Sequence, residues 1–174
     1  MKNKNWILKA FLLTFVIALL FNTFSNVLIS KFDSLLVLII ILIIFILIGI
    51  IFDIIGTAVL TAEESTFHAK SSKRIKGAKE GVYLIKNSST IASICNDVIG
   101  DICGIVSGGV AAIIGLLLAI KYGFSQVITI IIISSIISSL TVGGKAIGKK
   151  IAIKNSDEIV FYVAKVLSNF KSQK

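Results

Sequence analysis

Residues 34–64 read SLLVLIIILIIFILIGIIFDIIGTAVLTAEE, and this stretch decides the fold. Its first 19 residues, 34–52, are uncharged and consist almost wholly of Leu, Ile, Val and Phe. Three other uncharged stretches are of similar length: residues 10–30, 102–120 and 122–144 contain 21, 19 and 23 residues. Because a membrane-spanning helix needs about 20 apolar residues, the sequence predicts an all-α, polytopic membrane protein with four transmembrane helices.

The composition agrees with this prediction, since 56% of the residues are apolar, the mean hydropathy is +0.98 and proline is absent. The first apolar stretch follows basic residues, as in a signal peptide, but residues 21–25, FNTFS, offer no small-x-small cleavage pattern. We therefore assign it to a helix of the mature chain. Residues 88–120 would span about 50 Å as one helix, so this helix must leave the hydrocarbon core, tilt or be interrupted.

The net charge of +9 is distributed unevenly along the chain. Sixteen of the 18 basic residues lie in the N-terminus, in residues 70–86 and from residue 145 onward. The positive-inside rule then predicts a multi-pass protein of the cell membrane with both termini in the cytoplasm. Residues 65–87 are basic and mildly amphipathic, which predicts a juxtamembrane helical belt on anionic lipid. We expect no nucleic-acid binding, because the aromatic interleaving of single-strand binders is absent.

Carboxylates interrupt the apolar pattern at Asp53, Asp97 and Asp101. Acids inside a membrane are costly and usually functional. Asp97 and Asp101 are four residues apart, so on a helix they share a side, which Gly104 and Gly108 continue. Such small-residue stripes pack closely against other helices. We expect the acids to face a helix interface and the chain to form a homodimer through its glycine faces.

Two interpretations of these acids remain open. Mg²⁺ prefers oxygen ligands and keeps several waters beside one or two carboxylates, and Asp53, Asn96, Asp97 and Asp101 offer such oxygens. Alternatively, Lys145 neutralises the acids in a structural lock, within a non-transporting module whose basic belt binds a partner or anionic lipid. An enzyme is not expected, because the single histidine, the two cysteines and the remaining sequence form no hydrolase or phosphate-loop motif.

Residues 144–158, GKAIGKKIAIKNSDE, resemble the G-E-x-x-P-K-x-x-A-x-x-N-P-E stretch of the transmembrane domain of CorB and CorC magnesium/cobalt transporters and cyclin M (CNNM) proteins. Gly144, Lys149, Ala152 and Asn155 match it in register. Residues 95–104, CNDVIGDICG, are similar to short CorB-like bacterial proteins without cytoplasmic CBS domains. On this resemblance we divide the chain into an additional transmembrane helix at 1–33, a CorB-like transmembrane domain at 34–155 and a cytoplasmic amphipathic helix at 156–174.

The resemblance implies binding and transport of a divalent cation, Mg²⁺ or Co²⁺. It implies a metal site built from two groups of residues, Asp53, Gly56 and Thr57 in the first and Asn96, Asp97 and Asp101 in the second. The third group of the family's site departs here, because Lys145 stands at the position of the family's glutamate and Gly148 at that of its proline.

Overall fold

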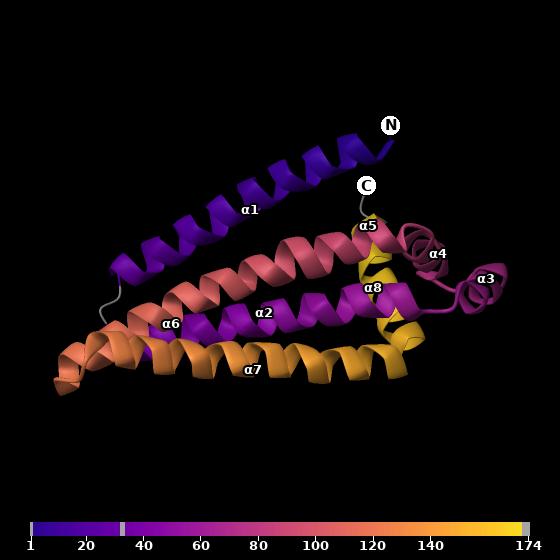
Figure 1. Ribbon diagram of the computed structural model, residues 1–174. Coiled ribbons are helices and arrows are strands. Elements are labelled where there is room, and N and C mark those ends of the chain that lie inside the picture. The colour runs from indigo at the N-terminus through magenta and orange to yellow at the C-terminus, as the bar shows by residue number, and fades with distance from the viewer. Residues whose placement is uncertain (1, 32–33, 172–174) are drawn as a thin grey trace. The chain divides into compact units, whose positions relative to one another are not determined.

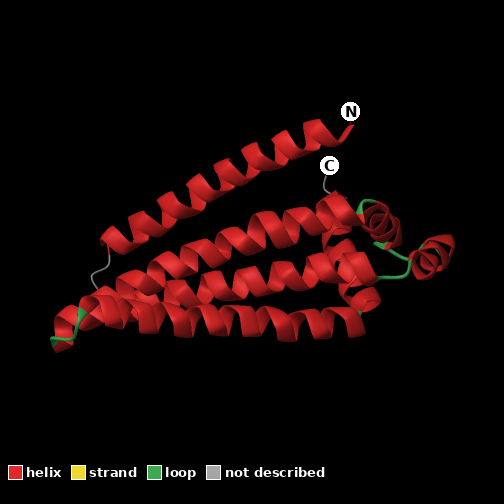
Figure 2. Ribbon diagram, viewed as in Figure 1, coloured by secondary structure: helices red, strands yellow, loops and turns green. Residues whose placement is uncertain are grey.

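The structure is a computed structural model that describes residues 2–31 and 34–171. In order, its helices are α1 (Lys2–Lys31), α2 (Leu35–Thr61), α3 (Glu64–Ser72), α4 (Ala78–Lys86), α5 (Ser88–Ala92), the π-helix η1 (Ser93–Gly100), α6 (Asp101–Tyr122), α7 (Gln126–Lys154) and α8 (Ser156–Lys171), drawn in Figure 1. Figure 2 shows that the described ranges contain helices and loops without a strand. The predicted all-α class is confirmed.

Three helical segments are long and apolar enough to cross a membrane: Leu35–Thr61, Ser88–Tyr122 and Gln126–Lys154. They contain three of the four predicted spans. The first predicted span lies in α1, whose apolar part within the described residues, Phe11–Thr23, is shorter than a full span. The four-span count therefore stays a prediction, and the predicted boundary at residue 33 lies outside the described residues.

The chain divides into two compact units. Unit 1 comprises residues 1–50 and 98–145, and unit 2 comprises residues 51–97 and 146–174. The helices α2, η1 and α7 each contribute residues to both units.

Unit 1 has a core of branched aliphatic side chains from α2 and α6. Leu38, Leu42 and Phe45 of α2 are buried against Val106 and Val110 of α6. The ring of Phe45 also meets Phe21 of α1 edge to face, with 5.6 Å between centroids. The apolar patterning of these helices thus supplies one hydrophobic core.

Unit 2 has a smaller core between the end of α2 and the three helices α3, α4 and α8. Phe67 of α3 is fully buried with Val59 of α2, Leu84 of α4 and Val160 of α8. The Phe67 ring lies against Gly81, where an added Cβ would be 2.2 Å from a ring carbon. The amphipathic segment predicted after residue 156 is thus a helix whose apolar side completes this core.

The long segment predicted at residues 88–120 is one continuous helical segment, Ser88–Tyr122, that includes η1. It is therefore not broken, and the alternatives that it tilts or leaves the hydrocarbon core stay predictions. Residues 93–100 form a π-helix between α5 and α6. A π-helix bonds each N–H to the carbonyl five residues earlier, and such segments are frequent at functional sites. Asn96 and Asp97 lie within it.

The predicted packing at the glycine stripe is wrong within the single chain. At Gly104 and Gly108 an added Cβ would meet no heavy atom within 4 Å. Close packing occurs instead at Gly115, where a Cβ would lie 2.9 Å from Cα of Ile130 in α7, and at Gly49, where it would lie 3.1 Å from Cβ of Cys103. A role for Gly104 and Gly108 as a contact face therefore depends on a second copy of the chain.

Candidate functional site

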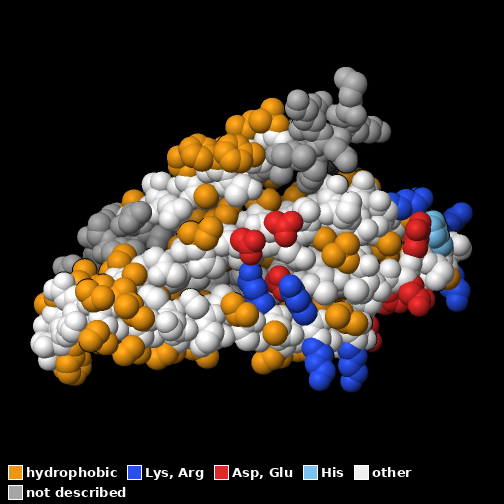
Figure 3. Space-filling model, viewed as in Figure 1, with side chains coloured by type: hydrophobic (Ala, Val, Ile, Leu, Met, Phe, Trp, Pro, Cys, Tyr) orange, Lys and Arg blue, Asp and Glu red, His pale blue; other side chains and the backbone are white. Residues whose placement is uncertain are grey.

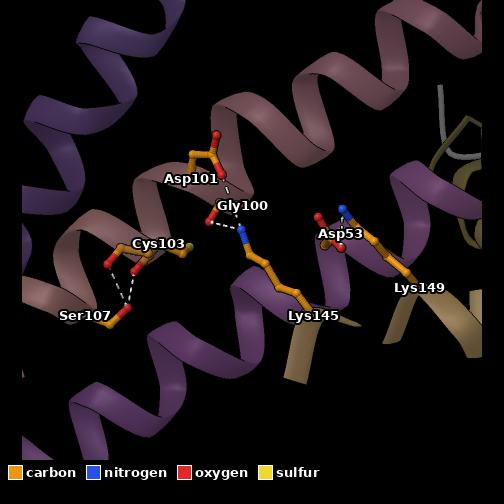
Figure 4. Close-up of polar contacts among 8 residues, drawn as sticks. Asp53, Gly100, Asp101, Cys103, Ser107, Lys145 and Lys149 are labelled. Atoms are coloured by element: carbon orange, nitrogen blue, oxygen red, sulfur yellow. Dashed lines mark hydrogen bonds and ion pairs between the residues drawn. The ribbon is translucent and has the colours of Figure 1, made fainter. Parts of the chain in front are cut away.

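The most buried carboxylate of the described residues is Asp53 of α2, in unit 2. Its side chain is 4% exposed, and its Oδ2 lies 3.7 Å from Nζ of Lys149 on α7 (Figure 4). At this distance the ammonium supplies opposite charge without a hydrogen bond. Lys149 itself is half exposed, at 51%. The pair therefore joins a buried anion to a cation that still reaches solvent.

Asn96 of η1 packs on α2 in the same unit. Its Oδ1 would lie 2.0 Å from a Cβ added at Gly56, so the absence of a side chain at Gly56 makes room for the amide. Oδ1 of Asn96 and Oδ2 of Asp53 are both buried, and neither has a hydrogen-bond partner among the described residues. Buried polar atoms are rarely left in this state, and each such atom calls for an explanation.

The remaining predicted residues of unit 2 differ in exposure. Thr57 is half-buried on α2, directly after Gly56, whereas Asp97 is exposed on η1. Neighbouring residues on a helix point in different directions. Asp97 can therefore be exposed although Oδ1 of Asn96 is buried. The expectation that Asp97 faces a helix interface is wrong within the single chain.

Asp101 belongs to unit 1, where it pairs with Lys145 of α7. Nζ of Lys145 donates to Oδ1 of Asp101 at 3.3 Å and to the carbonyl oxygen of Gly100 at 3.2 Å (Figure 4). Asp101 is 67% exposed and Lys145 only 17%. Asp101 therefore faces α7 through its contact with Lys145, although most of its side chain stays exposed.

A groove of about 440 Å³ begins at this second pair and continues between α6 and α7 of unit 1. Gly104, Gly108, Ser138 and Thr141 line it beside Asp101 and Lys145. Thr141 donates to the carbonyl oxygen of Ile137 at 2.8 Å, so its hydroxyl is satisfied by its own helix. The groove therefore offers open space along the glycines and one ion pair at its end.

The buried oxygens of unit 2 fit an oxygen-bound cation only in part. Among the residues described, no group of three or more His, Cys, Asp or Glu side chains could hold a metal ion. One carboxylate and one amide oxygen are the kind of partial set that Mg²⁺ accepts when it keeps several waters. Asp53 and Asn96 could thus hold a hydrated cation, and the ammonium of Lys149 lies where it would compete.

The sequence pattern names Lys145 among the lysines that could pair with the acids and does not single out Lys149. Lys145 and Lys149 are four residues apart and so project to one side of α7, which is the signal that could have indicated Lys149. Comparisons with family models, curated proteins and solved structures found no match for this chain. The functional argument therefore depends on the site itself.

Proposed function

We propose that this chain is a CorB-like membrane protein that binds a divalent cation, Mg²⁺ or Co²⁺, and moves it across the membrane. The observation that carries the proposal is the pair of buried oxygens, Oδ2 of Asp53 and Oδ1 of Asn96, that have no hydrogen-bond partner among the described residues. Leaving buried polar atoms unpaired costs about 1–3 kcal/mol each. A cation with its water shell would satisfy both oxygens at once.

The chemistry of the donors supports a hard cation. Carboxylate and amide oxygens are preferred ligands of Mg²⁺. The buried Cys95 also lies here, with its Cβ 3.1 Å from a Cβ added at Gly56. Gly56 keeps the space in which the Asn96 amide lies. Lys149 acts in this proposal as a tethered counterion: its half-exposed ammonium neutralises Asp53 and withdraws toward solvent when the divalent ion arrives.

The proposed topology has four membrane spans with both termini in the cytoplasm. The three apolar helical segments and the concentration of 16 of 18 basic residues outside the two short loops support it. In this topology α3 and α4 form the basic belt on anionic lipid. We also propose a homodimer, in which Gly104 and Gly108 of α6 would meet a second copy, because their open space suits close helix packing.

A second candidate function is a non-transporting membrane module held by lysine–aspartate pairs. The observation in its favour is that Lys145 and Lys149 each already lie beside an aspartate, at 3.3 and 3.7 Å. In such a module the lysines replace the metal permanently. This alternative predicts that no divalent cation stabilises the protein.

The test is the metal dependence of thermal unfolding for the purified full chain. Mg²⁺ or Co²⁺ at about 100-fold excess over Kd should stabilise the wild type by about 2.7 kcal/mol, which corresponds to about 5–10 °C. Asp53→Asn and Asn96→Ala should each abolish most of this shift. Asp101→Asn is the matched control, because it removes an equal charge from an exposed position, and it should keep the shift.

Three results would contradict the proposal. The first is a wild type that does not respond to either metal, as the second candidate function predicts. The second is an equal loss of response in Asp53→Asn and Asp101→Asn, which would indicate general charge attraction. The third is a response that persists in both Asp53→Asn and Asn96→Ala.

A further inference from the structure

A polar pocket of about 660 Å³ lies in unit 2, where the turn between α3 and α4 meets α8. Its lining comprises the basic residues Arg74, Lys76 and Lys79, the acid Glu80, and Ser71 at the end of α3. Ser168 of α8 closes the other side. Figure 3 shows charged side chains gathered over α3 and α4. The pocket is separate from the buried oxygens on α2 and η1.

The backbone of this turn has an unusual conformation. Arg74 has a φ of +54°, a left-handed conformation that a residue with a side chain rarely adopts. Gly77 follows at a φ of +90°, and an added Cβ there would lie 3.0 Å from the backbone of Lys165 in α8. Strained residues of this kind cluster at ligand-binding sites. The close approach of Gly77 to α8 gives the turn a fixed position within unit 2.

The charges of the pocket are unbalanced. Arg74, Lys76 and Lys79 are exposed, and no ion pair neutralises any of them among the residues that the structure describes. Glu80 is the one acid of the pocket lining. Two of the three serines in the lining already donate within their own helices, Ser72 to the carbonyl oxygen of His68 at 2.9 Å and Ser168 to that of Lys165 at 2.8 Å. The cations therefore carry whatever recognition the pocket performs.

We propose that this pocket binds a phosphate group. A guanidinium recognises phosphate through two parallel N–H bonds, and ammonium groups add point charge. The surroundings favour the phosphate of an anionic lipid headgroup over a free anion. Ile75, Tyr83 and Leu167 expose apolar side chains nearby, and a second hollow that shares Lys79 and Glu80 is lined by Tyr83 and Leu167. Acyl chains would cover these side chains.

This inference rests on the proposed function in one respect only, the location of α3 and α4 at the membrane surface. Its experiment measures phosphate binding and the previous one measures metal-dependent unfolding, so failure of either is distinguishable from failure of the other. The full chain in detergent is titrated with phosphatidylglycerol or with phosphatidylcholine, and bound lipid is counted by native mass spectrometry. A parallel arm titrates inorganic phosphate and monitors its ³¹P NMR linewidth.

The pocket variant carries Arg74→Gln, Lys76→Gln and Lys79→Gln together. It should bind phosphatidylglycerol about tenfold more weakly than the wild type, because hydrogen bonds to charged groups are lost. The control variant carries Lys86→Gln, Lys150→Gln and Lys154→Gln, which remove the same charge from exposed positions outside the pocket. Its binding should change by less than about twofold.

Glu80→Gln guards against misinterpreting a variant that simply folds poorly. Removal of the one acid should tighten phosphatidylglycerol binding about threefold, and misfolding does not produce such a gain. If the ³¹P signal of inorganic phosphate broadens with the wild type and not with the pocket variant, the pocket binds a free anion. If phosphatidylglycerol binds and inorganic phosphate does not, the phosphate group comes from a lipid. Equal losses in the two triple variants, no preference for phosphatidylglycerol together with no phosphate binding, or weaker binding by Glu80→Gln would overturn the proposal.

Discussion

The two lysine–aspartate pairs in the described part of this chain differ in which partner is buried: the acid in one pair and the lysine in the other. In unit 2 the acid Asp53 is buried and its lysine, Lys149, is half exposed. In unit 1 the acid Asp101 is exposed and its lysine, Lys145, is mostly buried and also donates to a backbone carbonyl. A buried acid needs some cation, and under the proposed function a divalent cation takes the place of the half-exposed Lys149. A buried lysine with two acceptors is a structural contact. Similar residue pairs therefore predict different behaviour.

The largest effect should follow from Gly56→Ala. The new Cβ would overlap the Asn96 amide, so the variant should lose about 3 kcal/mol of stability, as overpacked sites do, together with its metal response. Thermal unfolding with and without Mg²⁺ measures both. Gly143→Ala is the matched control in unit 1, where an added Cβ would meet no heavy atom within 4 Å and little change is expected. If the two variants are equally stable, the packing of Asn96 on α2 is not as described.

Lys149→Met should have the next largest effect, and the size of its destabilisation should depend on metal. Without a divalent cation it leaves a buried carboxylate unpaired, which should cost about 2 kcal/mol, less than for a fully buried pair because Lys149 is half exposed. Saturating Mg²⁺ should restore the stability. Lys150→Met, at the adjacent exposed position, should be near neutral. A loss in Lys149→Met that Mg²⁺ leaves unchanged would favour the structural lock.

Lys145→Met should cost about 1 kcal/mol, the usual contribution of a hydrogen bond, because the carbonyl of Gly100 loses its donor while the exposed Asp101 stays hydrated. Unlike the loss in Lys149→Met, this loss should be the same with and without Mg²⁺ in chemical denaturation. A Lys145→Met protein that Mg²⁺ rescues would place the two pairs in one functional class and remove the distinction between them.

The smallest effect should follow from Glu64→Gln, which removes the carboxylate that lies 3.0 Å from Nε2 of His68 on α3. The two side chains are 46% and 54% exposed and are four residues apart on one helix. Such pairs contribute about 0.2–0.5 kcal/mol. The same denaturation experiment measures this loss in the free energy of unfolding. The loss shows how much an exposed pair contributes, and the loss in Lys145→Met is compared with it. A loss above about 1 kcal/mol would show that α3 depends on this contact.

The sequence predicted the helical class and the three long apolar segments because uninterrupted runs of Leu, Ile and Val can be recognised from composition and length alone. It also singled out Asp53, Gly56 and Asn96. In unit 2 Asn96 packs on Gly56, and Asp53 and Asn96 each have a buried oxygen without a hydrogen-bond partner among the described residues. It expected Asp97 and Asp101 to face a helix interface, but Asp101 alone contacts another helix, through Lys145 of α7, and Asp97 is exposed. A spacing of four residues shows that two side chains share a side and does not show what each of them contacts. The partnership of Lys149 with Asp53 is a tertiary contact between helices far apart in sequence, which no local pattern specifies.

Unit 2 is held together by segments that are synthesised far apart in time. Oδ1 of Asp157 accepts a hydrogen bond from the backbone N–H of Glu63, the residue before α3, with 2.9 Å between the two atoms. The two residues are 94 positions apart in the sequence. At about 5–20 residues per second, translation of that interval takes on the order of 5–20 s. During this time Phe67 lacks the neighbours that α8 supplies. Unit 2 can therefore close only after the ribosome has delivered α8, which follows all three long apolar segments in the sequence.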